Sequence, residues 1–153
     1  MFLKYIVTNN KYKNINQILN QELHISTRLQ HKLIVQKHVM LNDKIIDTRS
    51  SVSLNDIITV DLTFNEESEN IISTPMSLNI IYEDECFLIL NKPAGIAVHP
   101  SILHYSDSLA NGVKFYFESI GLKCKIRPVN RLDLNTSGII IFAKNEYVQE
   151  CLI

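Results

Sequence analysis

A polar, acidic stretch near the middle of the chain separates two regions that can each form a core. Residues 65–77, NEESENIISTPMS, contain three glutamates and Pro75 but no basic side chain. Such a stretch is typical of a connection rather than of a regular helix or strand. We therefore expect a small domain at 1–64, an acidic linker at 65–77 and a second domain at 78–153.

Charge is distributed unevenly over the 153 residues. Residues 1–62 carry an excess of three positive charges, residues 63–91 have six acids and no base, and residues 92–153 carry an excess of two positive charges. Two basic regions around an acidic joint are compatible with a polyanionic partner such as a nucleic acid. The cysteines are few and far apart and no apolar run approaches about 20 residues, so we expect no metal knuckle, no membrane span and a cytoplasmic location.

The first region predicts a small α+β unit. Apolar residues recur at helical spacing over 15–23, and Ser26 can cap a second helix. Arg28 and Lys32 are four residues apart, so they share one face of that second helix. Three strand-like stretches follow, at 39–41, 45–46 and 57–60.

The second region predicts a β-hairpin over 78–90 and a helix that begins at Asp107 or Ser108 and ends before Gly121. A polar loop at 127–137 then leads into GIIIFA, residues 138–143, a run that suits a strand buried on both faces. Three strands and one full helix would leave an unpaired edge and an uncovered face, so we expect an incomplete domain.

The string VNRLDLNTSGIIIFAK, from Val129 to Lys144, carries the most chemistry. A loop rich in hydrogen-bonding residues that runs into a buried strand is typical of loops that present reactive groups. Asp133 is flanked by two leucines, which predicts a partly solvated carboxylate, and Arg131 is close enough to pair with it or with a phosphate. From the spacing alone, an ion-paired aspartate that caps a turn is the more common case.

The segment RLDLNTSG resembles the motif that carries the catalytic aspartate in the RluA family of RNA pseudouridine synthases. NKPAGIAVHP, Asn91 to Pro100, resembles the first motif of that family, and residues 15–62 resemble more weakly a small S4-like RNA-binding domain. The resemblance implies an α+β protein, with the S4-like domain followed by part of a mainly antiparallel, mixed-sheet catalytic domain. It also implies isomerisation of uridines in ribosomal or transfer RNA, with no cofactor and no metal.

Residue by residue, the resemblance implies that Asp133 is the catalytic aspartate and that Arg131 contacts the flipped-out nucleotide or fills its place. Thr136 would shape the loop. Lys92 would lie in the first-motif loop, where contact with RNA and ordering of the loop are both open.

Two features depart from the family pattern in the second region. Asn130 stands where members usually have His, and we expect this change to tune the loop rather than to abolish activity. Only 20 residues follow Asp133, whereas the resembling enzymes continue further. We therefore expect an N-terminal piece of such an enzyme that is inactive by itself.

The S4-like region also departs from the pattern. The glycines expected before and within its first hairpin are replaced near Lys37 and at Asp43. Arg28 and Lys32 still match the basic helix face, which either contacts RNA or is a solvated charged surface.

Two other functions stay open at this point. A non-catalytic RNA-binding module would bind RNA regardless of an Asp133→Ala change. An unrelated hydrolase with Asp133 as nucleophile would need an acid/base that the same loop lacks. We expect His99 and His104, five residues apart in a loop, to be structural or solvent-facing rather than metal ligands.

Overall fold

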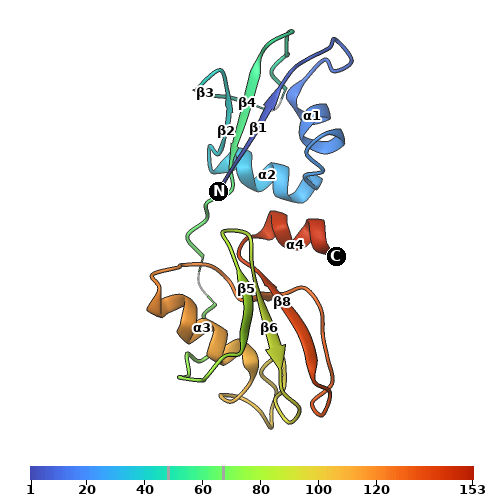
Figure 1. The fold of residues 1–153 in the computed structure, drawn as a ribbon. Helices are drawn as coiled ribbons and strands as arrows, with labels where there is room; N and C mark the ends of the chain where they lie inside the picture. The colour runs from blue at the N-terminus through green and yellow to red at the C-terminus, as the bar shows by residue number, and fades with distance from the viewer. Residues whose placement is uncertain (48, 67) are drawn as a thin grey trace. The chain divides into compact units, whose positions relative to one another are not determined.

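The computed structural model describes residues 1–47, 49–66 and 68–153, so Thr48 and Glu67 lie outside the description. The chain forms two compact units, Met1–Thr63 and Phe64–Ile153. Each unit combines helices with one antiparallel sheet, which confirms the predicted α+β class (Figure 1). None of the helices in the described residues is long and apolar enough to cross a bilayer.

The first unit has a four-stranded sheet in the order β1-β4-β2-β3 and two helices that follow β1. Its elements are β1 (Phe2–Ile6), α1 (Ile15–Gln21), α2 (Thr27–Val35), β2 (Val39–Leu41), β3 (Lys44–Ile45) and β4 (Ile57–Asp61). The predicted helices and strands are present, and the Ser26 hydroxyl accepts from the Leu29 N–H at 3.2 Å as the N-cap of α2. Strand β1, which no sequence pattern predicted, pairs along its whole length with β4.

Two positions where the family resemblance expects glycine have the backbone that favours glycine. Lys37, just after α2, has φ 61°, and Asp43, in the β2–β3 turn, has φ 65°. The left-handed region is costly for side chains with a Cβ, although aspartate tolerates it better than lysine. The replacements therefore keep the turn geometry while losing the residue best suited to it.

The second unit has a sheet in the order β5-β6-β8-β7, with every neighbouring pair antiparallel. Its elements are β5 (Ile80–Glu83), β6 (Phe87–Lys92), α3 (Leu109–Ser119), β7 (Arg127–Pro128), β8 (Gly138–Ala143) and α4 (Glu146–Leu152). The predicted hairpin is β5–β6, and α3 begins at Ser108 with a capping box. Buried residues of α3, β6 and β8 form the core, including Phe117, Leu90 and Phe142.

The described residues of the segment 65–77 fall within the second compact unit and pack against it. Glu66 pairs with Arg127 at 2.6 Å, and the Lys114 ammonium donates to the Ile71 carbonyl at 2.7 Å. The Ile71 side chain also packs against the core. The apolar residues in this acidic stretch supply surface that the second unit buries, which outweighs its linker-like composition.

The prediction that β8 is buried on both faces is wrong. Ile140 and Phe142 are fully buried on the α3 side, whereas Ile139 is 47% exposed. Side chains alternate between the two faces of a strand, and the core lies on only one face of this sheet. A continuous apolar run therefore does not by itself show that both faces are covered.

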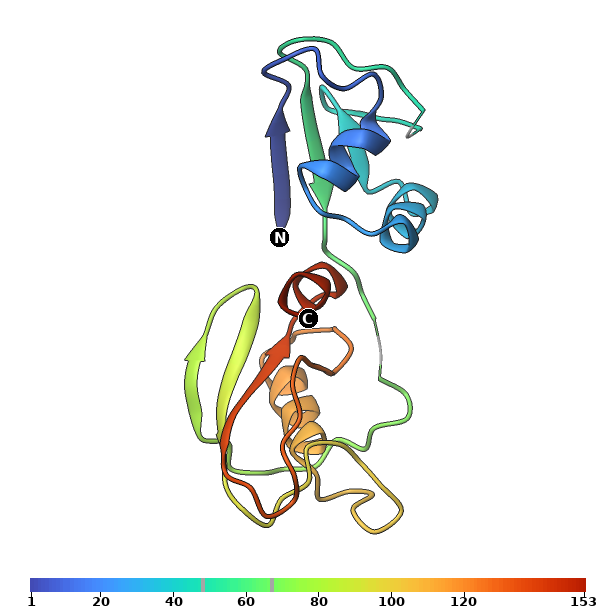
Figure 2. The ribbon, with the colours of Figure 1, turned by 90° about the vertical axis from the view of Figure 1, so that its right-hand side faces the viewer.

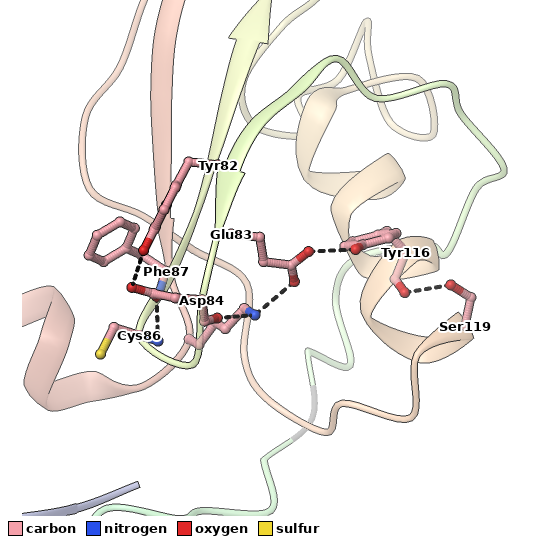
Figure 3. A network of polar contacts seen from close by, with 8 residues as sticks. Tyr82, Glu83, Asp84, Cys86, Phe87, Tyr116 and Ser119 are labelled. Carbon is pink, nitrogen blue, oxygen red and sulfur yellow. Dashed lines mark hydrogen bonds and ion pairs between the residues drawn. The ribbon is translucent and has the colours of Figure 1, made fainter.

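The turn of the β5–β6 hairpin carries a network of polar contacts between the sheet and α3 (Figure 3). Glu83 accepts from the Lys144 ammonium at 2.7 Å and from the Tyr116 hydroxyl at 2.5 Å, while Asp84 accepts from the N–H of Phe87 at 2.9 Å. Burial acts to raise the pKa of Glu83, but the bonds from Lys144 and Tyr116 outweigh it and lower that pKa. We call Glu83, Asp84, Tyr116 and Lys144 the hairpin-end network.

Candidate active site

The two sequence motifs meet at the other end of the same sheet. Strand β6 ends at Lys92 and β8 begins at Gly138, and these two residues are paired in the antiparallel ladder. The loop after Lys92 and the loop before Gly138 therefore leave the sheet side by side, at the end away from the hairpin turn (Figure 2). We call residues 130–137 the Asp133 loop.

Lys92 joins the two motifs from inside the protein. Its side chain is fully buried, and its ammonium donates to the carbonyls of Pro93 at 2.9 Å, Ile96 at 2.7 Å and Leu134 at 3.0 Å. Burial lowers the pKa of Lys92, and the negative charge of Asp133 acts in the opposite direction. Of the two roles open for Lys92, these contacts support ordering of the loops, because the residue has no exposed surface.

The Asp133 loop is fixed by further contacts. The Gly95 N–H donates to the Leu134 carbonyl at 2.8 Å, and the Thr136 N–H donates to the Asp133 carbonyl at 3.1 Å, which closes a turn. Leu132 packs against the core, and its Cδ1 lies 3.3 Å from where a Cβ at Gly138 would stand. With a φ of 147° as well, Gly138 is a position where a side chain would strain the loop.

Asp133 is an exposed residue on this loop. Leu132 turns into the core, but Leu134 is itself 38% exposed and does not cover its neighbour. Arg131 is also exposed, and among the described residues no ion pair joins it to Asp133. A negative and a positive group thus stand at the surface of one loop, both accessible to a ligand.

Asn130 lies at the base of the Asp133 loop and contacts the backbone of β8. Its Nδ2 donates to the Ile139 carbonyl at 2.8 Å, and its Oδ1 accepts from the Ile141 N–H at 3.0 Å. Both polar atoms of its amide therefore have partners within the protein.

His99 is a member of this site that the sequence argument did not place there. Desolvation of its ring lowers the pKa of His99, and the positive charge of Arg131 acts in the same direction. This effect of Arg131 on His99 indicates that the end of the first motif lies near the Asp133 loop. The only available signal was the position of His99 inside the string that resembles the first motif.

The structure thus gathers Lys92, Asn130, Arg131, Asp133 and Thr136 at one end of the second unit. Arg28 and Lys32 belong to the first unit, on α2, where Arg28 is exposed and Lys32 half-buried. Within the described residues, no group of three or more His, Cys, Asp or Glu side chains is arranged to hold a metal ion.

The region that contains both motifs is similar in sequence to a known protein family. Residues 86–152 match the family model for RNA pseudouridylate synthase, and this span includes both motifs and α4. Residues 86–152 belong to that family. The predicted family resemblance is confirmed by the match and by the relatives that follow.

Curated relatives extend the similarity beyond the matched segment. The chain is 33% identical over 135 residues to the uncharacterized RNA pseudouridine synthase YhcT of Bacillus subtilis. This alignment covers 88% of the chain and 44% of that protein. It is 32% identical over 115 residues to the ribosomal large subunit pseudouridine synthase D of Neisseria meningitidis, covering 75% of this chain and 31% of that protein. The chain therefore spans less than half the length of these pseudouridine synthases.

Proposed function

We propose that this chain is part of an RNA pseudouridine synthase in which Asp133 is the catalytic carboxylate. The observation that carries the proposal is an accessible carboxylate on an immobilised loop. Asp133 is exposed, while the residues around it are held by Lys92, Gly95 and the core. A reactive group fixed in place needs no reorganisation when the substrate arrives, which favours catalysis.

The reaction suits a single carboxylate. The N1–C1′ glycosidic bond of uridine breaks, the uracil turns, and a C5–C1′ bond forms while C5 loses a proton and N1 gains one. Because the product is an isomer, the reaction needs no oxidant or reductant. Asp133 can serve as a nucleophile at C1′ or C6 or as a base toward the ribose, and an ionised form suits all three roles.

Access to the uridine requires an unpaired or extruded base, because the reacting atoms are out of reach inside a helix. Arg131 is exposed on the same loop as Asp133. In the proposal its guanidinium contacts a phosphate or occupies the space that the flipped nucleotide leaves. Thr136 keeps the turn that presents Asp133, through its backbone bond to the Asp133 carbonyl.

We propose a structured ribosomal RNA as the substrate, with transfer RNA as the second candidate. The printed name of the Neisseria meningitidis relative, a ribosomal large subunit pseudouridine synthase, supports this order. We also propose that the 153-residue chain does not complete the reaction alone. Asp133 and Arg131 are exposed in it, and the chain covers only 44% and 31% of the two relatives named above.

The first unit, in the proposal, is an S4-like module that binds RNA through α2. Arg28 and Lys32 lie four residues apart on this helix, so both can face one phosphate backbone. We expect Arg28→Glu with Lys32→Glu to weaken RNA binding and flatten its salt dependence. The matched control is Lys4→Glu with Lys44→Glu, which reverses two exposed lysines of the same unit on β1 and β3. Equal affinity for both double variants at low salt would contradict the role of α2.

The catalytic proposal is tested by tritium release from RNA labelled at C5 of uridine. The 153-residue chain is assayed beside a chimera in which it replaces the matching region of the Neisseria meningitidis relative. We expect release from the chimera and none from the chain alone. Asp133→Ala should abolish release from the chimera, and a folded Asp133→Ala chimera that keeps its activity would contradict the proposal.

A further inference from the structure

The pairing of β7 with β8 ends in an unusual way. The ladder runs from Arg127 to Pro128, and the Val129 N–H continues it by donating to the Ile141 carbonyl at 2.8 Å. The backbone then leaves the sheet to form the Asp133 loop. The next two hydrogen bonds to β8 come from the side chain of Asn130. Its amide donates to the Ile139 carbonyl and accepts from the Ile141 N–H.

We infer that Asn130 is a positioning residue that closes the base of the Asp133 loop by replacing a backbone peptide in the β7–β8 ladder. Its importance for the reaction rests on the proposed role of Asp133. A primary amide offers one acceptor and a donor in the arrangement that a strand uses. It can therefore extend the ladder after the backbone has turned away. Asn130 lies three residues before Asp133, so the place where the loop leaves the sheet sets where the carboxylate stands.

The chemistry of the position discriminates between replacement side chains. Aspartate has nearly the same shape but cannot donate, so it would set a negative oxygen against the Ile139 carbonyl. Alanine offers neither bond. A neutral histidine has one donor and one acceptor, whereas its protonated form has no acceptor for the Ile141 N–H. The charged or titratable groups around the loop are Lys92, His99, Arg131 and Asp133.

The inference is tested first by amide hydrogen exchange on the 153-residue chain itself. In Asn130→Ala we expect exchange of the Ile141 amide to be about tenfold faster, the effect of losing one ordinary hydrogen bond. The Thr136 amide, which closes the turn at Asp133, should also exchange faster. Asn130→Asp, which conserves shape, should do the same, and Asn130→His should restore slow exchange at a pH where the imidazole is neutral.

Asn42 provides a matched control in the first unit. Its Oδ1 accepts from the Ile57 N–H at 2.9 Å and its Nδ2 donates to Asp56 at 2.9 Å, so it also bridges backbone and side chain with both amide atoms. Asn42→Ala should speed exchange at Ile57 and leave Ile141 and Thr136 unchanged. Unchanged exchange at Ile141 and Thr136 in both Asn130→Ala and Asn130→Asp would overturn the inference.

The catalytic consequence is tested in the active chimera. Misplacement of Asp133 by about 1 Å should lower kcat by about 100-fold in Asn130→Asp, with KM changed by less than about threefold. A residue that binds RNA would raise KM instead, and that result would overturn the positioning role. If no chimera isomerises uridine, the proposed function fails, whereas the exchange measurements still decide whether Asn130 closes the loop.

Discussion

The two ends of the sheet in the second unit handle charge in opposite ways. At the hairpin end, Glu83 and Lys144 form a half-buried ion pair that Tyr116 completes with a hydrogen bond. At the other end, the buried charge is Lys92, whose ammonium is bound by carbonyls alone, while the carboxylate of Asp133 lies at the surface. A carboxylate already engaged by a lysine contributes to stability, whereas an exposed one remains available to a substrate.

Within one small unit, one end of the sheet thus stabilises the fold and the other end presents a reactive carboxylate. The hairpin-end network ties α3 to β5 and to the residue after β8. Lys92 holds the two motif loops together through backbone carbonyls, and within the described residues no direct bond joins it to Asp133. Substitutions at the two ends should therefore have different effects on the free energy of unfolding, and the following predictions run from the largest change to the smallest.

Lys92→Met should lower the free energy of unfolding of the second unit by about 3 kcal/mol. The change leaves three carbonyls without their donor in a buried site. Hydrogen exchange of the β6 and β8 amides under native conditions measures the loss. The control is Lys125→Met, which changes an exposed lysine of the same unit. A loss below about 1 kcal/mol would mean that water or a loop rearrangement replaces the ammonium.

Lys144→Met should cost about 2 kcal/mol, because it leaves the half-buried Glu83 carboxylate without its cationic partner. The same exchange measurement applies, again with Lys125→Met for comparison. The two ends are distinguished by a second readout. Lys144→Met should leave exchange at Thr136 unaffected, whereas Lys92→Met should accelerate it.

Glu83→Gln should remove part of the acid sensitivity of the second unit. The pKa of Glu83 is lowered from 4.5 in the folded protein, so its contribution is complete above that value and is lost as the pH falls through the lower folded value. Unfolding free energies at about pH 7 and about pH 3 should therefore differ less in Glu83→Gln than in the parent protein. The pKa of Asp84 is also lowered, chiefly by the N–H of Phe87, so some acid sensitivity should remain.

Asp133→Asn should change the free energy of unfolding by less than about 0.5 kcal/mol, because the side chain is exposed. In the active chimera the same change should abolish tritium release. This pair of results would show the smallest effect on stability together with the largest effect on the reaction. A clear loss of stability would instead mean that the Asp133 side chain stabilises the loop.

Local signals in the sequence were sufficient for much of the fold. Helical spacing and the Ser26 cap predicted the helices of the first unit, and strand-like stretches predicted β2, β3 and the β5–β6 hairpin. These features depend on neighbours in the chain, so the sequence reports them directly. The motif RLDLNTSG likewise predicted where the exposed carboxylate would be, although not how exposed it is.

The remaining features depend on contacts between distant residues. A lysine is rarely fully buried, and only the converging carbonyls of two loops explain why Lys92 is. The acidic segment 65–77 joins the second unit because of partners such as Arg127, about sixty positions further along. His99, which follows β6, is affected by the charge of Arg131, which lies shortly before β8. No periodicity or local motif in the sequence predicts such contacts between distant residues.

The pairing of Lys92 with Gly138 also limits how a chain of this kind can vary. Because side chains alternate along a strand, one residue inserted into β6 would send Lys92 to the opposite face, and one inserted into β8 would shift its register and offset the two loops. Residues added within a loop, beyond this last rung, would leave the parity of the strands intact. Length changes among natural or designed versions should therefore accumulate in the loops, while the six-residue strands that end and begin at this rung keep their length.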